Sequence, residues 1–176
     1  FLFKILIYRI DSSKFSVANQ VFSDLDQILG RPLTEIIFDG NIDELTLTTN
    51  SQPAIMAVSS AILESIRSEN LINLDRIKAV AGHSLGEYSA LYAASSISFS
   101  SSIQLLEVRS RAMQESMPVG TGGMAAIIGK SMLEVEDLLD SIKDYGQISI
   151  ANDNADGQIV VSGEMSAINH LCDNSK

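Results

Sequence analysis

The feature that most constrains the fold is the pentapeptide Gly82-His83-Ser84-Leu85-Gly86, which stands between an apolar run and a helical pattern. Residues 76–81 have the length and composition of a short buried strand, and Tyr88, Leu91 and Tyr92 then recur at helical spacing. A Gly-x-Ser-x-Gly sequence between a strand and a helix is typical of a nucleophile elbow, in which a tight turn strains the serine backbone. The two glycines are expected to leave room for that turn. An accidental match is the alternative, because glycine and serine are common residues.

The elbow predicts a nucleophile beside a backbone hydrogen-bond donor that can stabilise an oxyanion. We expect the Ser84 hydroxyl to stand at the N-terminus of the following helix, and the Leu85 N–H to point where a carbonyl oxygen becomes an oxyanion. A serine nucleophile needs a base within hydrogen-bond reach. His83 is expected to be a buried histidine, because neighbours at a sharp turn project in different directions, and His170 a surface or packing residue. Neither histidine is therefore a convincing base.

The first part of the chain reads as helices around the elbow. Helical spacing predicts a helix from Ser16 that stops at Gly30, and a second that opens near Asn50 with Pro53 in its first turn. A further helix is predicted over residues 102–116. The apolar run 1–10, which carries two basic residues, is interpreted as a buried strand and not as a signal peptide.

The pattern changes after a linker that contains Pro118 and Gly120. Beyond it the order is strand, helix, strand, strand, helix, with strands predicted at 124–128, 147–151 and 158–162. This order is typical of a split β-α-β, ferredoxin-like unit that lacks its last strand. The sequence therefore predicts an α/β chain with a small second subdomain.

Two arginines on the helix predicted over 102–116 differ in their neighbours. Arg111 has glutamates at both i−4 and i+4, which is typical of a solvated, charge-paired helix face. Arg109 instead has Leu105 and Met113 at these offsets, so it lies on an apolar stripe and needs an anionic partner. An internal carboxylate would satisfy it, and so would a substrate carboxylate held by both arms of the guanidinium. The pattern leaves both partners open.

The composition excludes several classes of protein. Lys and Arg number 12 and Asp and Glu 22 among the 176 residues, so the net charge of −10 disfavours nonspecific binding to nucleic acid. No window approaches the roughly 20 apolar residues that a membrane span requires, so no membrane association is expected. The single cysteine, Cys172, cannot form an internal disulfide, and we expect a cytoplasmic setting.

Four stretches of the sequence carry a resemblance to a known family. They are GHSLGEYSAL at 82–91, SQPAIMAVSSAI at 51–62, VRSRAMQESMPVGTGGMAAIIG at 108–129 and ANDNADGQIVVSG at 151–163. With these motifs the sequence resembles the malonyl-CoA:acyl carrier protein transacylase family and the related acyltransferase domains of polyketide and fatty-acid synthases. The resemblance covers most of residues 16–172.

The resemblance implies an α/β-hydrolase-like large subdomain with an inserted ferredoxin-like small subdomain that is incomplete at its C-terminus. We expect the large subdomain at residues 1–118 and the small one at 119–176, with the active site between them. Ser84 would be the acyl-accepting nucleophile, with the Leu85 N–H as one oxyanion donor and Arg109 on the malonyl carboxylate. Gln52 falls on a glutamine near the family's site, and Asn152 on an asparagine at the cleft.

The implied reaction moves a malonyl group from coenzyme A to the phosphopantetheine thiol of acyl carrier protein, through an acyl-serine, in fatty-acid biosynthesis. It uses no metal or redox cofactor, and malonyl-CoA and acyl carrier protein are the expected partners. A serine hydrolase of the esterase type is one alternative, because it shares the elbow. A fragment that acts only as a binding module is another.

The resemblance also implies a second oxyanion donor and a catalytic histidine that this sequence does not show. The family opens with a strand and then Gly-Gln-Gly-Ser-Gln, which supplies the second oxyanion donor, whereas here Phe1-Leu2-Phe3 runs directly into Lys4-Ile5-Leu6. The family's catalytic histidine follows a return strand that is not reached before Lys176. We therefore expect a truncated chain that is inactive by itself and prone to aggregate through unpaired sheet edges.

Overall fold

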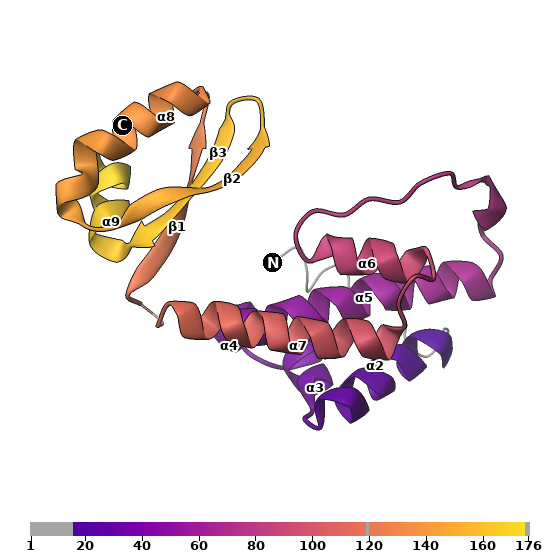
Figure 1. The fold of residues 1–176 in the computed structure, drawn as a ribbon. Coiled ribbons are helices and arrows are strands. Elements are labelled where there is room, and N and C mark those ends of the chain that lie inside the picture. The colour runs from indigo at the N-terminus through magenta and orange to yellow at the C-terminus, as the bar shows by residue number, and fades with distance from the viewer. Residues whose placement is uncertain (1–15, 119, 175–176) are drawn as a thin grey trace. The chain divides into compact units, whose positions relative to one another are not determined.

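The computed structural model describes residues 16–118 and 120–174, and the chain divides into two compact units, Phe1–Gln114 and Glu115–Lys176 (Figure 1). The strand predicted over residues 1–10 lies outside the described residues. Each unit has its own core of buried apolar side chains. Helices and a small antiparallel sheet make the chain an α/β protein, as the sequence predicts.

The first unit is built from helices in its described part. The core includes Leu25, Met56, Ile103 and Leu106, all fully buried, and it joins three helices distant in sequence. The helices are α2 (Ser16–Leu29), α3 (Leu33–Phe38), α4 (Ile42–Thr46), α5 (Thr48–Ser68), α6 (Gly86–Ala93) and α7 (Phe99–Ser116).

Helix α2 has the predicted bounds, because Gly30 ends it with a φ of 65°, a left-handed conformation that glycine adopts without steric cost. Helices α3 and α4 follow in a stretch for which the sequence predicted no element. Asn41 caps α4, and its side chain accepts a hydrogen bond of 2.7 Å from the Glu44 N–H.

Helix α5 begins at Thr48, earlier than predicted, so the placement of Pro53 in the first turn was wrong and the proline lies in the second turn. Pro53 has no N–H to donate to the Thr49 carbonyl four residues before it. The side chain of Arg31 replaces that donor, with 2.9 Å between Nη2 and the Thr49 oxygen. Arg31 Nη1 also donates to Asn50 Oδ1 at 2.7 Å, so the start of α5 is fixed by polar contacts from the α2–α3 turn.

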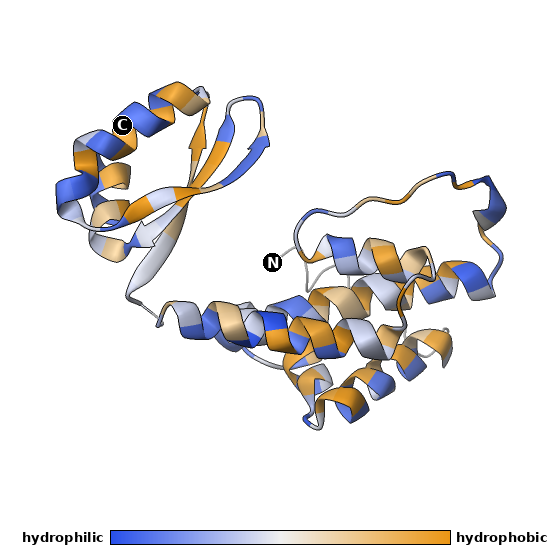
Figure 2. Cartoon of the chain, viewed as in Figure 1, coloured by the Kyte–Doolittle hydropathy of each residue, from blue (hydrophilic) through white to orange (hydrophobic). Residues whose placement is uncertain are grey.

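The prediction of a buried strand at residues 76–81 was wrong for the described structure. A 3₁₀ turn covers Leu74–Arg76, and irregular chain then leads to α6, with Ile77 46% and Val80 43% exposed. This stretch is the apolar part of the loop that precedes α6 in Figure 2. A strand needs a neighbour that accepts and donates its backbone hydrogen bonds. The described residues of the first unit contain no strand that could be that neighbour.

The second unit confirms the predicted order of strand, helix, strand, strand, helix. Both pairings in its three-stranded sheet, ordered β1-β3-β2, are antiparallel, and Gly157 forms the β2–β3 turn with a φ of 72°. Val135, Val161 and Ile168 bury one sheet face against the two helices. The elements are β1 (Gly122–Ile128), α8 (Met132–Ile142), a 3₁₀ turn (Lys143–Tyr145), β2 (Ile148–Ala155), β3 (Gln158–Glu164) and α9 (Met165–Asp173).

Helix α8 begins with a capping box. Ser131 Oγ accepts from the Glu134 N–H, and the Glu134 carboxylate accepts from the Ser131 N–H at 2.9 Å. These hydrogen bonds from Ser131 hold the pKa of Glu134 below its usual value. Among all described helices, none has the length and apolarity needed to cross a membrane.

Candidate active site

The turn at Ser84 has the strained geometry that the sequence predicts. Ser84 has a φ of 56°, a left-handed conformation that is uncommon for a residue with a side chain. The chain then enters α6 at once, since the Gly86 N–H donates to the His83 carbonyl at 2.9 Å and the Glu87 N–H to the Ser84 carbonyl at 3.2 Å. The Ser84 side chain is exposed at the start of this helix.

The two glycines of the motif have different steric roles. A Cβ atom added to Gly82 would lie 1.9 Å from the Gly86 carbonyl oxygen and 2.6 Å from the Glu87 nitrogen, so no side chain fits there. A Cβ added to Gly86 would meet no atom within 4 Å. The expectation that both glycines leave room for the turn is therefore confirmed for Gly82 and wrong for Gly86 in the described structure.

The Leu85 N–H lies one residue after Ser84, at the start of α6, where backbone donors of a helix are not yet paired within it. In the described part of the chain, no carbonyl or side chain accepts a hydrogen bond from it. A donor in this place, at the positive end of a helix dipole, can stabilise negative charge that develops on an acyl oxygen at Ser84.

His83 is exposed, so the prediction that it is buried was wrong. It follows residues 76–81, which the sequence predicted would form a buried strand and which are exposed instead. His170 lies on α9, partly buried, and stacks on Tyr145 with ring centroids 3.5 Å apart, which confirms a packing role. No cluster of three or more His, Cys, Asp or Glu side chains that could hold a metal occurs within residues 16–118 and 120–174.

Arg109 joins Ser84 to helix α5. Its Nη2 donates to Ser84 Oγ at 2.9 Å, and its Nη1 donates to Gln52 Oε1. Both oxygens are neutral, and Arg109 forms no ion pair with any described side chain. The guanidinium therefore carries a positive charge beside Ser84 without a carboxylate partner among these residues.

The surroundings of Arg109 on α7 confirm the predictions from the helix offsets only in part. Arg111 pairs with Glu107, with 3.2 Å between nitrogen and oxygen, as its helix face predicts. Leu105 and Met113, the predicted apolar stripe around Arg109, are 50% and 48% exposed. Arg109 itself is only half-buried between them.

Gln52 is 4% exposed and all of its polar atoms are used. Besides accepting from Arg109, its amide Nε2 donates to Thr48 Oγ1 at 2.7 Å and to Met113 Sδ at 3.3 Å. Thr48 and Met113 therefore belong to this site, and the sequence did not predict them there. The signal that could have found them is helical spacing, because Thr48 stands four residues before Gln52, and Met113 four after Arg109.

Asn152 lies on β2 in the second unit, where its side chain is exposed. It pairs with Val160 on β3 just after a shift of register that follows Ile150. Its expected role at a cleft stays a prediction, whereas Ser84, Gln52 and Arg109 lie together within the first unit.

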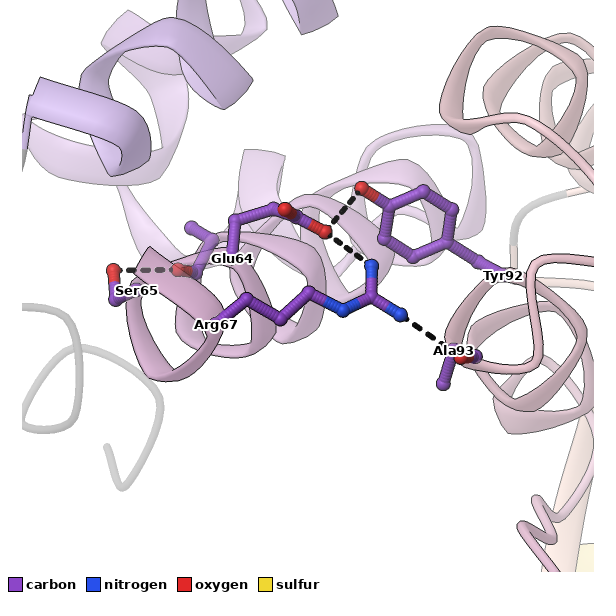
Figure 3. Close-up of polar contacts among 6 residues, drawn as sticks. Glu64, Ser65, Arg67, Tyr92 and Ala93 are labelled. Atoms are coloured by element: carbon purple, nitrogen blue, oxygen red, sulfur yellow. Dashed lines mark hydrogen bonds and ion pairs between the residues drawn. The ribbon is translucent and has the colours of Figure 1, made fainter. Parts of the chain in front are cut away.

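A polar cluster holds α6, the helix after the elbow, against α5 (Figure 3). The Tyr92 hydroxyl donates to Glu64 Oε1 at 2.8 Å, and Arg67 Nη1 lies 2.7 Å from the same oxygen. Arg67 Nη2 also donates to the Ala93 carbonyl at 2.9 Å. Burial and the hydrogen bond to Glu64 together raise the pKa of Tyr92 to about 12.

Comparison with known proteins identifies the class of this chain. The model of the acyl transferase domain family matches residues 14–176, and the chain belongs to this family of acyltransferases. It is 42% identical over 147 residues to the malonyl CoA-acyl carrier protein transacylase of Bacillus subtilis, which covers 83% of this chain and 45% of that protein. The Escherichia coli K12 protein of the same name is 33% identical over 158 residues, covering 89% and 50%.

Solved structures agree with this assignment. An acyl-carrier-protein-S-malonyltransferase from Bartonella henselae has a TM-score of 0.82 and 44% identity, covering 92% of this chain and 52% of that one. A malonyl-transacylase solved in complex with a type II PKS acyl-carrier protein has a TM-score of 0.80 and 35% identity, with the same coverage. The chain spans about half the length of the relatives it matches.

Substitution of Gly82 should disrupt the elbow, whereas the same change at Gly86 should not. We expect Gly82→Ala to lower the free energy of unfolding by about 1–3 kcal/mol, because the added methyl overlaps the Gly86 carbonyl. Gly86→Ala is the matched control and should be neutral or stabilising, since alanine favours a helix by up to about 1 kcal/mol over glycine. Thermal unfolding measures both. Equal effects of the two substitutions would contradict the steric argument.

Removal of the Tyr92 hydroxyl should change the alkaline stability of the protein. Because the folded pKa of Tyr92 is about 12 and its unfolded value about 10, the unfolded state loses the proton first, and stability falls as the pH rises from 10 to 12. Tyr92→Phe should reduce this fall, and at neutral pH should cost about 0.5–1.5 kcal/mol for the lost hydrogen bond. Urea unfolding at pH 7 and across pH 9.5–11.5 measures both effects.

Tyr145→Phe is the control for the alkaline measurement, because Tyr145 is half exposed and its hydroxyl bonds to no described residue. An identical pH dependence of Tyr92→Phe and the unsubstituted protein would show that the Tyr92–Glu64 contact does not form in solution.

Proposed function

We propose that this chain carries the nucleophile and the acyl-carboxylate site of a malonyl-CoA:acyl carrier protein transacylase. Such an enzyme moves a malonyl group from coenzyme A to the phosphopantetheine thiol of acyl carrier protein, in fatty-acid biosynthesis. The observation that carries the proposal is the contact between the Arg109 guanidinium and the Ser84 hydroxyl. The names of the similar proteins support the same reaction.

In the first half of the reaction, Ser84 Oγ attacks the thioester carbonyl carbon of malonyl-CoA and its proton passes to a base. The family resemblance assigns that base to a histidine outside this sequence. Negative charge develops on the carbonyl oxygen and is stabilised by the Leu85 N–H and the N-terminus of α6. The carbon–sulfur bond then breaks, coenzyme A leaves as its thiol after taking up the proton, and malonyl remains as an ester of Ser84.

The second half reverses these steps with another thiol. The phosphopantetheine thiol of the carrier protein gives its proton to the base, and its sulfur attacks the acyl-serine carbonyl. The ester bond breaks, and the Ser84 oxygen takes the proton back. The route is ping-pong, and the atoms and charges balance without a metal or redox cofactor.

Arg109 selects an acyl group that carries a carboxylate. In the described structure one arm of its guanidinium is held by Gln52 and the other by the neutral Ser84 hydroxyl. A malonyl carboxylate replaces the hydroxyl as a better acceptor, because a hydrogen bond to a charged group contributes about 1.5–3 kcal/mol. An acetyl group offers no such acceptor and loses this stabilisation.

The finer architecture also belongs to this proposal. We assign residues 1–118 to an α/β-hydrolase-like subdomain, residues 119–176 to a ferredoxin-like one, and Asn152 to the substrate-binding residues. The sheet of β1, β3 and β2 with α8 and α9 supports the second assignment. The absence of a second cysteine beside Cys172 in the sequence supports a cytoplasmic setting.

Loss of the Ser84 hydroxyl should abolish covalent labelling by substrate. The full-length protein that carries this sequence, incubated with radiolabelled malonyl-CoA, should retain label after denaturation, and Ser84→Ala should retain none, because no ester can form. Ser89→Ala is the matched control, since Ser89 lies further along α6 and donates to Met56 Sδ. Equal labelling of Ser84→Ala and the unsubstituted protein would reject the proposed function.

Removal of the Arg109 side chain should affect malonyl transfer far more than acetyl transfer. We expect Arg109→Ala to lower kcat/KM for malonyl-CoA by about 10- to 100-fold relative to acetyl-CoA, as the loss of charge-assisted hydrogen bonds predicts. Arg111→Ala, on the same helix but paired with Glu107 and exposed, should leave the ratio unchanged. Steady-state transfer of both acyl groups measures the ratio, and equal losses would remove the carboxylate role of Arg109.

A further inference from the structure

We propose that Thr48 is a positioning residue that sets the preference of this site for a carboxylate-bearing acyl group. Its hydroxyl holds the buried Gln52 amide in the orientation that aims Arg109. The inference rests on the proposed function, since it concerns the same guanidinium.

The Gln52 amide can face its neighbours in only one way. Arginine has donors and no acceptor, so the Gln52 oxygen has to face Arg109. A thioether sulfur only accepts, so the amide nitrogen has to face Met113. An amide turned over would place its NH₂ against the guanidinium, where two donors meet and neither bonds.

Thr48 is the stronger of the two groups that hold the amide nitrogen. Its Oγ1 lies 2.7 Å from Gln52 Nε2, whereas the Met113 sulfur, a weak acceptor, lies at 3.3 Å. Thr48 is in the first turn of α5, and residues four apart on a helix are neighbours. A threonine side chain also has few χ1 rotamers, so its hydroxyl occupies a defined place.

Loss of this acceptor has a specific consequence. Gln52 is 4% exposed, so water does not readily replace the Thr48 hydroxyl. The amide then keeps only a sulfur on its nitrogen side and no longer holds Arg109 Nη1 in one position. A guanidinium that is not held in place loses part of its binding to a carboxylate, because ordering it then costs free energy on binding. An acetyl group, which does not use Arg109, is unaffected.

The test compares three variants of the full-length protein in malonyl and acetyl transfer. Thr48→Val keeps the size of the side chain and removes the acceptor, and should lower kcat/KM for malonyl-CoA by about 3- to 10-fold with little change for acetyl-CoA. Thr48→Ser restores the hydroxyl and should recover most of the loss. Thr49→Val is the matched control at the neighbouring position, where only the backbone carbonyl has a hydrogen-bond role in the described structure.

A double-substitution cycle separates positioning from general damage. In an Arg109→Ala background, Thr48→Val should cause no further loss of malonyl transfer, because the group that it positions is gone. An equal loss in both backgrounds, an equal loss for both acyl groups, or no loss at all would overturn the proposal.

Side-chain NMR gives a readout that does not depend on activity. The Gln52 NH₂ resonances, assigned by their loss in Gln52→Ala, should shift in Thr48→Val and stay in place in Thr49→Val. Unchanged resonances would reject the role of Thr48, whatever the transfer rates. Failure of the unsubstituted protein to acylate Ser84 would instead reject the proposed function, and the NMR result would still decide whether Thr48 holds the amide.

Discussion

The site depends on one guanidinium that is shared between two neutral oxygens. Arg109 comes from α7, Gln52 from the start of α5 and Ser84 from the turn before α6, so its two hydrogen bonds join three segments far apart in the sequence. Neither partner neutralises the charge. A half-buried cation with only neutral partners retains most of its attraction for a carboxylate, whereas an internal salt bridge would have used it. Of the two partners that the sequence left open for Arg109, the structure therefore shows no internal carboxylate among the described residues.

The strained turn at Ser84 persists because the elements around it are fixed. A left-handed φ at a serine costs free energy that other contacts have to offset. Gly82 allows the backbone before the serine to touch the backbone after it, and no other residue would. The far end of α6 is held on α5 by Tyr92 and Arg67, which share the Glu64 carboxylate. Ser84 is thus placed by a helix that is fixed at both ends.

Local patterns in the sequence predicted four helices of the first unit and the order of the second unit, missed the short helices α3 and α4, and failed where structure depends on distant parts of the chain. Helical spacing and glycine stops are local, so α2 was predicted to within a residue. The strand at 76–81 was wrong because strand formation requires a partner, and the exposure of His83 has the same cause. Arg109 was found from its helix offsets, but its contact with Gln52 joins residues 57 positions apart. Thr48 was missed because the helix was predicted to open near Asn50, which left Thr48 outside it, and Met113 because its contact with Gln52 exists only once α5 and α7 pack together.

The net charge of −10 opposes the proposed substrates, because coenzyme A and carrier proteins are both anionic. Long-range repulsion between surface charges and hydrogen bonds at contact differ in how strongly salt screens them. At physiological ionic strength the Debye length is about 8 Å, so repulsion from acidic side chains spread over the surface is largely screened. The hydrogen bonds of Arg109 act at contact, beside Ser84, where screening is weak. Under the proposed function, preference for an anionic acyl group depends on the orientation of this one guanidinium and not on the sum of the charges, and the buried Gln52 amide contacts that guanidinium directly.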